Sequence, residues 1–247
     1  MVEPVSPVAP LLTGAKILRQ NWVDLTFLHW PVDPGRIAHL FPAGTTPDTF
    51  DDVSYVGVVA FRMTGTGFGY GPGVLGSFLE TNVRLYSVDR TGRRGVVFLS
   101  LDTPRLDVVC AARTALGVRY RWARMSYRRH GERRAYTTAV RWPRVRAASH
   151  IEVEAGDVLM PGPLEHFLTA RWGLHVAHGG RTWYVPNEHP AWSLRSAELC
   201  GFDEDGLFAS VGLGTLCAGP PAHVAFSDGV PARFGLPVRA GTPRRSR

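Results

Sequence analysis

The sequence predicts a mainly β protein of the α+β class, in which an antiparallel or mixed sheet is closed into a barrel or folded into a sandwich. Three observations favour this fold class. Stretches of alternating apolar and polar residues are numerous, helical patterns are few and short, and strands and helices do not alternate regularly as a doubly wound fold requires. A chain of 247 residues with 45% apolar content can also bury one large core.

Strand-like alternation recurs along the chain, and each such segment alternates with a period of two. The predicted strands are 22–30, 54–63, 76–88, 95–101, 121–127 and 135–142, with weaker candidates at 181–185 and 222–226. The basic run RRHGERR lies between two of these strands, so it predicts a hairpin with a solvated tip around Gly131.

Three short helices are predicted from their boundary residues. One begins at Asp33 with Pro34 in its first position, which suits the fixed backbone angle of proline. A second covers 104–116, with Asp102 or Thr103 as its cap and Gly117 as its stop. The third covers 163–173.

The ends of the chain differ in composition from its centre. Residues 1–14 are predicted to be a flexible arm, and residues 231–247 a basic, disordered tail, because both are rich in proline, glycine or arginine. Residues 15–230 then form a single domain. The glycine-rich stretch 64–76 joins two strands and opens no helix, so we interpret it as a flexible loop over a cavity mouth.

The composition narrows the classes of partner. The formal charge of +7 comes from 27 arginines and one lysine, but no basic face with interleaved aromatic residues indicates a nucleic acid partner. Cys110, Cys200 and Cys217 lack any paired spacing, which predicts free, mostly buried thiols in a reduced, cytoplasmic protein. Neither a signal peptide nor a membrane span is indicated.

Motifs for metals and cofactors are also missing from the sequence. His175 and His178 stand three apart, but no third ligand follows at metal spacing, so no metal site is predicted. Because no phosphate-binding or dinucleotide-binding glycine motif occurs, we expect no cofactor.

The segment FLETNVRLY divides its side chains between two faces of a strand. Glu80, Asn82 and Arg84 share one face, with Phe78 and Tyr86 at either end. Neighbours on one face lie about 6.6 Å apart, so a small organic acid can touch two polar groups at once. A solvated sheet face remains the alternative interpretation.

Two arginines interrupt apolar helical stripes. Arg113 lies on the stripe of the second helix, and Arg171 on that of the third. A buried guanidinium needs a carboxylate, carbonyl groups or a water-filled cavity around it. Each arginine either reaches a shared polar cavity with the Glu80 strand or extends its head outward along the surface.

Seven motifs in the same order resemble the YqjF-like family of uncharacterised bacterial proteins, which belongs with the acetoacetate decarboxylase-like superfamily. The resemblance covers about residues 20–200. The motifs are WVDLTFLHWPVDP, FP with PDTFDD, YVGVVAFRM, FLETNVRLY, the region from SLDTPRL to YRWARM, FLTARWGL and HPAWSL.

The resemblance implies a conical β-barrel with the ligand site in its interior. In the decarboxylases a glycine turn precedes a pair of lysines, of which the first attacks the ketone of the substrate. Pattern matching puts Gly117 at that glycine and Tyr120 and Arg121 at the lysine pair. Lys16 is the single lysine of the chain and lies in an early peripheral segment, so Schiff-base chemistry is not expected.

We therefore expect Glu80, Arg84 and Tyr120 to be catalytic. The expected substrate-binding residues are Asn82, Tyr86, Arg113, Arg121, Arg171, His29 and Trp30. The first hypothesis is a cofactor-free lyase, dehydratase, aldolase-type enzyme or cyclase of specialised metabolism, acting on a keto acid or a related carbonyl or carboxylate compound. A non-catalytic binder or sensor of a carboxylated metabolite is the second, an inert structural protein is the third, and self-association into a homo-oligomer is left open.

Overall fold

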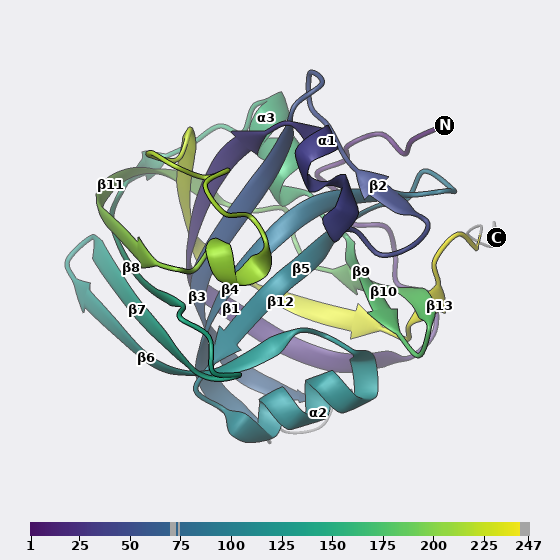
Figure 1. Ribbon diagram of the computed structural model, residues 1–247, viewed down its shortest axis with the longest axis horizontal. Coiled ribbons are helices and arrows are strands. Elements are labelled where there is room, and N and C mark those ends of the chain that lie inside the picture. The colour runs from purple at the N-terminus through teal and green to yellow at the C-terminus, as the bar shows by residue number, and fades with distance from the viewer. Residues whose placement is uncertain (70–72, 74, 243–247) are drawn as a thin grey trace.

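One sheet of thirteen strands dominates the computed structural model, which describes residues 1–69, 73 and 75–242 (Figure 1). The strands are β1 (Lys16–Val32), β2 (Thr45–Pro47), β3 (Ser54–Phe68), β4 (Gly76–Asp89), β5 (Arg94–Thr103), β6 (Tyr120–His130), β7 (Arg133–Trp142), β8 (Ala148–Val158), β9 (Gly173–His178), β10 (Arg181–Glu188), β11 (Leu194–Asp205), β12 (His223–Gly235) and β13 (Val238–Arg239). The mainly β prediction is confirmed.

The sheet closes on itself twice. The order β5-β6-β7-β8-β11-β12-β1-β3-β4 forms a ring because β4 also pairs with β5. A second ring runs through β9 and β10, which join β5 to β12. The two rings share β12, β1, β3, β4 and β5, so each shared strand has one face toward each interior.

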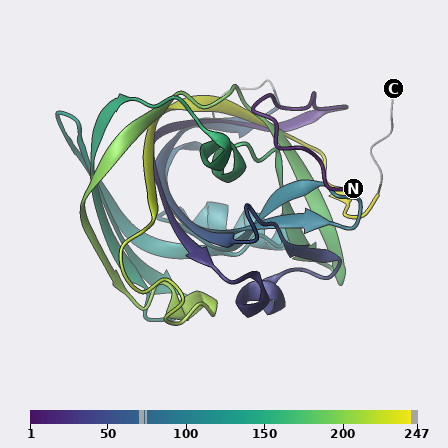
Figure 2. The same cartoon turned by 90° about the horizontal axis from the view of Figure 1, so that it is seen from above.

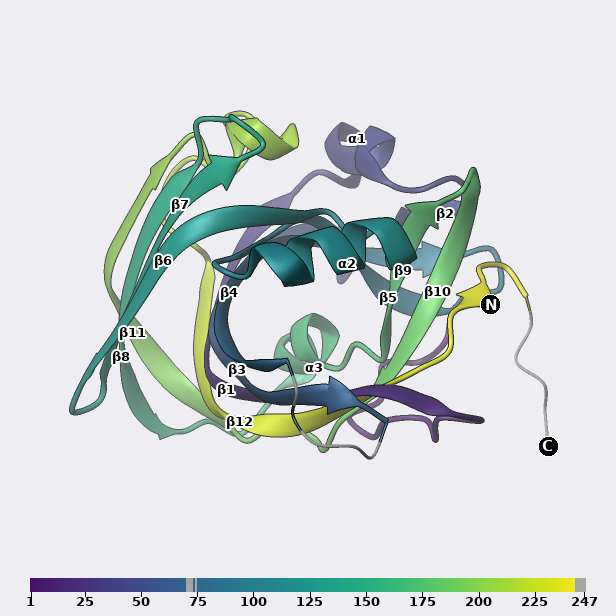
Figure 3. The same ribbon diagram turned by 90° about the horizontal axis from the view of Figure 1, so that it is seen from below.

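Three α-helices, α1 (Pro34–Ile37), α2 (Leu106–Leu116) and α3 (Pro163–Thr169), accompany the sheet in the described residues. Asp33 caps α1 by accepting from the backbone N–H of Gly35, and Gly117 ends α2 in the left-handed conformation, as predicted. Seen from above, α3 lies inside the outline of the strands (Figure 2). Seen from below, α2 lies across the end of the sheet (Figure 3).

Each ring interior holds its own hydrophobic cluster. The nine-stranded ring contains Val83, Leu85, Ile151 and Val153 among others. The second ring contains Tyr86 and Tyr120, together with Phe167 and Leu168 of α3. A third cluster around Phe27, Phe61 and Met63 continues along the β1, β3 and β4 wall of the second ring. The alternation of residues along β4 therefore supplies two different cores.

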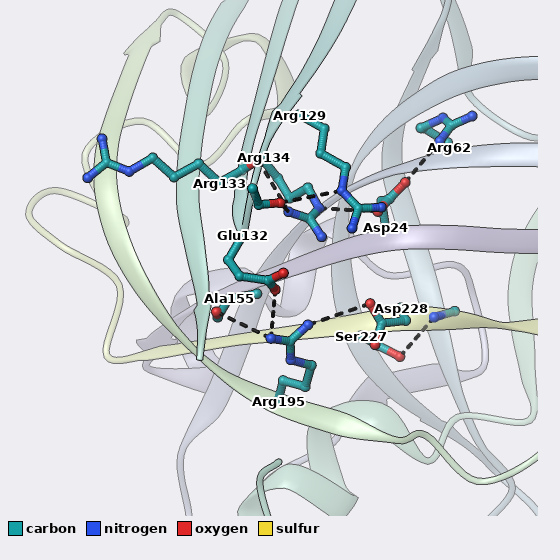
Figure 4. Close-up of polar contacts among 12 residues, drawn as sticks. Asp24, Arg62, Arg129, Glu132, Arg133, Arg134, Ala155, Arg195, Ser227 and Asp228 are labelled. Atoms are coloured by element: carbon teal, nitrogen blue, oxygen red, sulfur yellow. Dashed lines mark hydrogen bonds and ion pairs between the residues drawn. The ribbon is translucent and has the colours of Figure 1, made fainter. Parts of the chain in front are cut away.

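The hairpin between β6 and β7 turns at Gly131, as predicted, but its tip is only partly solvated. Arg134 is fully buried, and its Nε donates to Oδ1 of Asp24 over 3.2 Å (Figure 4). Asp24 occupies an irregular stretch of β1 with a positive φ of 53°. The prediction that the whole basic run is solvated was wrong, because β1 provides a carboxylate within reach.

The expectations for the ends and for the glycine-rich stretch need correction. β12 pairs with β1 as far as Gly235, and β13 follows it, so residues 231–239 belong largely to the sheet instead of a loose tail. Residues 243–247 of the predicted tail lie outside the described residues. In residues 1–14 no helix or strand forms, but Ser6 and Leu12 bond to the domain. Residues 64–68 extend β3 and Gly76 begins β4, while residues 70–72 and 74 lie outside the described part.

The prediction of free thiols is confirmed, whereas the prediction that they are mostly buried was wrong. Cys217 is buried, but Cys110 and Cys200 are exposed. Val109 is the one fully buried residue of α2 and packs with Ala112 and Leu116 in the core of the second ring, whereas Cys110 and Arg113 lie on the exposed side of the helix. Among the described residues, none of the helices has the length and apolar character needed to cross a membrane.

Candidate functional site

The strand β4 separates its residues as the alternation predicted. Val83 and Leu85 face the nine-stranded ring. Glu80, Asn82, Arg84 and Tyr86 face the second ring, where the first two and Tyr86 are buried and Arg84 is half-buried. The alternative of a solvated sheet face is therefore wrong for these four positions.

A continuous hydrogen-bonded chain links the three expected catalytic residues through Asn82, which is an expected substrate-binding residue. Tyr120 Oη donates to Glu80 Oε2 over 2.6 Å, and Asn82 Nδ2 donates to Glu80 Oε1 over 3.1 Å. Arg84 Nε donates to Asn82 Oδ1 over 2.9 Å. Among the described residues this is the one hydrogen bond of the Arg84 guanidinium, whose plane also lies 5.4 Å from the Phe98 ring. Its two terminal amino groups are therefore available to an anion.

Burial controls the ionisation of this chain. It raises the pKa of Glu80, and the hydrogen bonds from Tyr120 and Asn82 and the charge of Arg84 oppose that rise only in part. Burial and the neighbouring Glu80 hold the pKa of Tyr120 well above its usual value, so Tyr120 remains a neutral donor. Burial also lowers the pKa of Arg84. A carboxyl group poised closer to neutrality can both accept and return a proton.

The register of the sheet builds a second set of contacts in one row. His223 of β12 lies opposite His29 of β1, His29 opposite Gly57 of β3, and Gly57 opposite Arg84. A Cβ atom at Gly57 would lie 3.0 Å from Arg84 Cγ, 3.1 Å from Tyr86 Oη and 3.2 Å from His29 Cδ2. The glycine therefore makes room for three larger side chains to meet.

His29 is the centre of this row. It is fully buried, its Nε2 lies 2.7 Å from Tyr86 Oη, and its Nδ1 lies 3.0 Å from Nδ1 of His223. Burial, then the nearby His223 and Arg84, hold the pKa of His29 well below its usual value. Burial raises the pKa of Tyr86 to about 12. Both groups are therefore uncharged at neutral pH.

His189 lies near the same arginine and was not among the expected site residues. Its ring packs between Trp172 and Trp192, with centroids at 4.5 and 4.8 Å, and its Nδ1 lies 2.7 Å from the carbonyl oxygen of Pro190. Burial lowers the pKa of His189 to about 4, with a further contribution from Arg84. The motif HPAWSL marked this segment in the sequence, but nothing in it pointed toward β4.

The Arg171 side chain points into the protein, as the first of the two interpretations of its helical stripe predicted. Its Nη1 lies 2.5 Å from Asp48 Oδ2, which also binds Arg94 at 2.5 Å. The guanidinium lies over the Phe167 ring at 4.3 Å and over the Tyr86 ring at 4.9 Å. Arg171 thus borders the site through Tyr86, while its charge is balanced by Asp48.

Three of the expected site residues lie elsewhere. Arg113 is exposed, stacks on Trp142 at 4.9 Å and donates to the carbonyl oxygen of Tyr120. Arg121 forms a buried two-pronged ion pair with Asp102, at 2.5 and 2.8 Å, on the opposite face of β6 from Tyr120. Asp102 is therefore not the cap of α2.

Trp30 also faces away, into the core of the nine-stranded ring, and donates to the carbonyl oxygen of Gly219. Neighbouring residues of a strand point to opposite faces, so His29 and Trp30 cannot both reach one site, and neither can Tyr120 and Arg121.

Other features of the described residues do not coincide with this chain of polar groups. Within the described ranges, no group of three or more His, Cys, Asp or Glu residues is arranged to hold a metal ion. A surface hollow of about 540 Å³ lies over β6, β7 and β8, and another of about 300 Å³ lies beside Phe98 and His175. Lys16 pairs with Glu188 at 2.5 Å at the start of β1.

The sequence of this chain is similar to a described protein family and to a protein of Bacillus subtilis. The model of DUF2071, a family described as an uncharacterized conserved protein, matches residues 19–231. The protein YqjF of Bacillus subtilis (strain 168), also described as uncharacterized, is 30% identical over 189 residues, which are 75% of this chain and 78% of YqjF. Both similarities confirm the resemblance to the YqjF-like family that the seven sequence motifs indicated.

Solved structures share the fold at low identity. An acetoacetate decarboxylase-like enzyme from Sphingomonas wittichii RW1 has a TM-score of 0.61 at 14% identity, over 94% of this chain and 98% of its own. The enduracididine biosynthesis enzyme MppR, complexed with pyruvate, has a TM-score of 0.59 at 14% identity, over 93% and 91%. At such identity the likeness establishes the fold and leaves the chemistry to the residues of the site.

Proposed function

We propose that this chain, which belongs to the DUF2071 family of uncharacterized conserved proteins, is an enzyme that moves a proton beside the carbonyl group of a small keto acid or related carboxylate. The chain of hydrogen bonds from Tyr120 through Glu80 and Asn82 to Arg84 is the single observation that carries the proposal. It combines an acid with a raised pKa and a cation with unused donors in one buried row.

Each residue has a distinct role in this proposal. The two terminal amino groups of Arg84 bind the substrate carboxylate in a two-pronged contact. In enolisation Glu80 removes a proton from the carbon next to the carbonyl group and returns it, and in dehydration the proton that it removes leaves with the hydroxyl group as water. When carbon dioxide leaves instead, the protonated Glu80 gives its proton to the enolate carbon that remains. Tyr120 keeps Glu80 oriented and donates a hydrogen bond, and Asn82 sets the spacing between Glu80 and Arg84.

The proposed reaction does not use an imine. Tyr120 and Arg121 take the places of the lysine pair of the decarboxylases, and Lys16 is engaged with Glu188. The developing enolate is stabilised instead by the nearby positive charge of Arg84 and by the hydroxyl group of Tyr120. The closed strand ring that contains Glu80, Arg84 and α3 is the conical barrel in this view, and its interior is the small-molecule pocket.

A screen with matched variants tests the proposal. Thermal-shift measurements with keto acids, hydroxy acids and acyl thioesters, followed by mass spectrometry, identify ligands and products. Glu80→Gln should abolish turnover while ligand affinity stays close to that of the wild type and the melting temperature does not fall. Arg84→Ala should weaken ligand binding, whereas Arg124→Ala, at an exposed position of β6, should not. Lys16→Arg should retain full turnover, and its inactivity would contradict a reaction without an imine.

A binding protein or sensor for a carboxylated metabolite is the second candidate. One observation favours it, because both oxygens of Glu80 already accept hydrogen bonds and leave few lone pairs for a substrate proton. In that case Arg84→Ala weakens binding, Glu80→Gln changes little, and no compound in the screen is converted to product.

A further inference from the structure

Four ionisable side chains from separate elements lead from the Arg84 network toward the surface. Tyr86 Oη lies 2.7 Å from His29 Nε2, and His29 Nδ1 lies 3.0 Å from His223 Nδ1. His223 Nε2 lies 3.6 Å from Glu165 Oε1 of α3. The side-chain exposure rises from none at His29 to 8% at His223 and 20% at Glu165.

We propose that Tyr86, His29, His223 and Glu165 form a proton-transfer chain that connects the buried site with solvent at α3. The inference rests on the proposed function in one respect, since a reaction that moves a proton in a buried site must exchange it with water. The chain itself is a property of the ligand-free protein and can be tested without a substrate.

The contact between the two histidine rings restricts which of their nitrogen atoms can carry a hydrogen. A hydrogen bond between two Nδ1 atoms requires that one ring carry its hydrogen there and that the other present a bare nitrogen. If His223 donates from Nδ1, its Nε2 is bare and free to receive a proton, since among the described residues this buried atom has no hydrogen-bond partner. His29 then carries its hydrogen on Nε2 and donates it to Tyr86 Oη, which leaves the phenol hydrogen free for a ligand.

One transfer along the chain shifts each proton by one place. When Glu80 keeps the proton that it removed, Tyr86 gives its hydroxyl proton to the enolate of the ligand in its place, and the Nε2 proton of His29 moves to the Tyr86 oxygen. The Nδ1 proton of His223 moves to Nδ1 of His29, and a solvent proton delivered at Glu165 binds Nε2 of His223. At each step one O–H or N–H bond breaks and one forms, and both rings stay neutral.

The surroundings favour neutral rings. His29 faces Tyr86 and Arg84 of β4, uncharged Gly57 of β3 and His223 of β12. His223 faces His29 and, from α3, Glu165. Burial lowers the pKa of His223, and the carboxylate of Glu165 opposes that effect. A charged imidazolium next to Arg84 would cost free energy, so a chain of neutral tautomers suits this position.

Nuclear magnetic resonance of the ligand-free protein tests the chain directly. Nitrogen shifts of the wild type should show one ring with its hydrogen on Nδ1 and the other with its hydrogen on Nε2. The Nε2 hydrogen of His29 should exchange with D2O roughly tenfold or more slowly in His223→Gln, because an amide cannot pass the proton on. Glu165→Gln, which can still cap Gly162, should slow it by a smaller factor, and His130→Gln in the exposed hairpin should have no effect.

Unchanged exchange in His223→Gln, or hydrogens on Nε2 of both rings in the wild type, overturns the proposal. The second result needs no variant, so it stands even if His223→Gln does not fold.

Deuterium incorporation into the methyl group of pyruvate in D2O separates this inference from the proposed function. If incorporation depends on Glu80 but neither it nor ring exchange depends on His223, the proton chain is wrong and the enzymatic proposal stands. If pyruvate takes up no deuterium while ring exchange depends on His223, the chain stands and the proposed substrate class is wrong. Dependence of both measurements on His223 supports the two proposals together.

Discussion

Arg134 and Asp24 join the β6–β7 hairpin to the irregular stretch of β1, with Nε and Oδ1 3.2 Å apart (Figure 4). Arg134 has no exposed surface, its Nη1 donates to the carbonyl oxygen of Gly131 over 2.7 Å, and its guanidinium lies 5.1 Å from the Phe226 ring. Tyr136 donates from its hydroxyl to the carbonyl oxygen of Asp24. These buried contacts of Arg134 therefore connect β7 with β1 and β12, which are three strands of the nine-stranded ring.

Arg134→Met should lower the free energy of unfolding by about 3 kcal/mol or more, because it leaves a buried carboxylate with less compensation. The neighbouring Arg133, which pairs with Glu154 while 56% of its side chain is exposed, provides the control. Arg133→Met should change the free energy of unfolding little, because solvent screens an exposed ion pair. Urea denaturation of both variants gives the comparison, and equal losses would show that burial does not distinguish the two arginines.

Glu80→Gln should stabilise the protein at neutral pH. The pKa of Glu80 is raised in the folded state, so its ionisation disfavours folding as pH rises through that pKa. The favourable contribution of the protonated acid is fully present below the unfolded value of 4.5 and is lost above the folded pKa.

Denaturation of wild type and variant at pH 7.5 and pH 4 should therefore show an advantage for the variant at the higher pH and a smaller difference at the lower pH. Glu198→Gln, at an exposed position of β11, is the control and should show no such dependence. A constant difference across pH would indicate that Glu80 has an ordinary pKa.

Gly57→Ala should disturb the meeting of His29, Tyr86 and Arg84. The added methyl group would lie between 3.0 and 3.2 Å from one side-chain atom of each, so these side chains would have to shift by a few tenths of an ångström. We expect a loss of about 1–3 kcal/mol, as for overpacked cores. A Cβ atom added at Gly201 of β11 would meet only Glu152 Cβ, at 3.9 Å, so Gly201→Ala should be nearly neutral. Thermal denaturation of the two variants gives the comparison.

Tyr120→Phe should raise the pKa of Glu80 further. The hydrogen bond from Tyr120 to Glu80 Oε2 favours the carboxylate and counteracts burial, so its removal leaves burial less opposed. Carbon-13 titration of the Glu80 carboxyl group measures the change. Tyr55→Phe is the matched control, because Tyr55 packs against Phe167 and, among the described contacts, makes no hydrogen bond to Glu80. A downward shift in Tyr120→Phe would contradict the role given to this hydrogen bond.

Local pattern was sufficient for features that depend on neighbours in the sequence. The two faces of β4, the cap of α1 at Asp33 and the stop of α2 at Gly117 follow from residue type and spacing alone. β8 also carried a usable signal, because Ile151 and Val153 alternate with polar residues, yet it was not predicted. The signal for β11 is weaker, since half of that strand faces solvent and its sequence is rich in acidic residues.

Features that depend on partners far along the chain could not be predicted. His223 meets His29 across 194 residues, and Arg134 meets Asp24 across 110. In the sequence, Arg134 is one of several arginines beside a turn, and nothing local separates it from its exposed neighbours. Arg113 shows the opposite error, because its place on an apolar stripe suggested an inward side chain, whereas α2 meets the core through Val109, Ala112 and Leu116 and leaves Arg113 exposed.

Because β4 is shared by the two strand rings, its position constrains which sequence changes the protein can tolerate in evolution. Odd-numbered positions such as Val83 and Leu85 fill one core, and even-numbered positions such as Glu80 and Arg84 furnish the other. A single inserted or deleted residue would exchange the two sets, sending charges into the hydrocarbon and leaving the polar row without its acid and its cation. Related chains should therefore vary here by replacement alone, with length changes confined to the turns on either side.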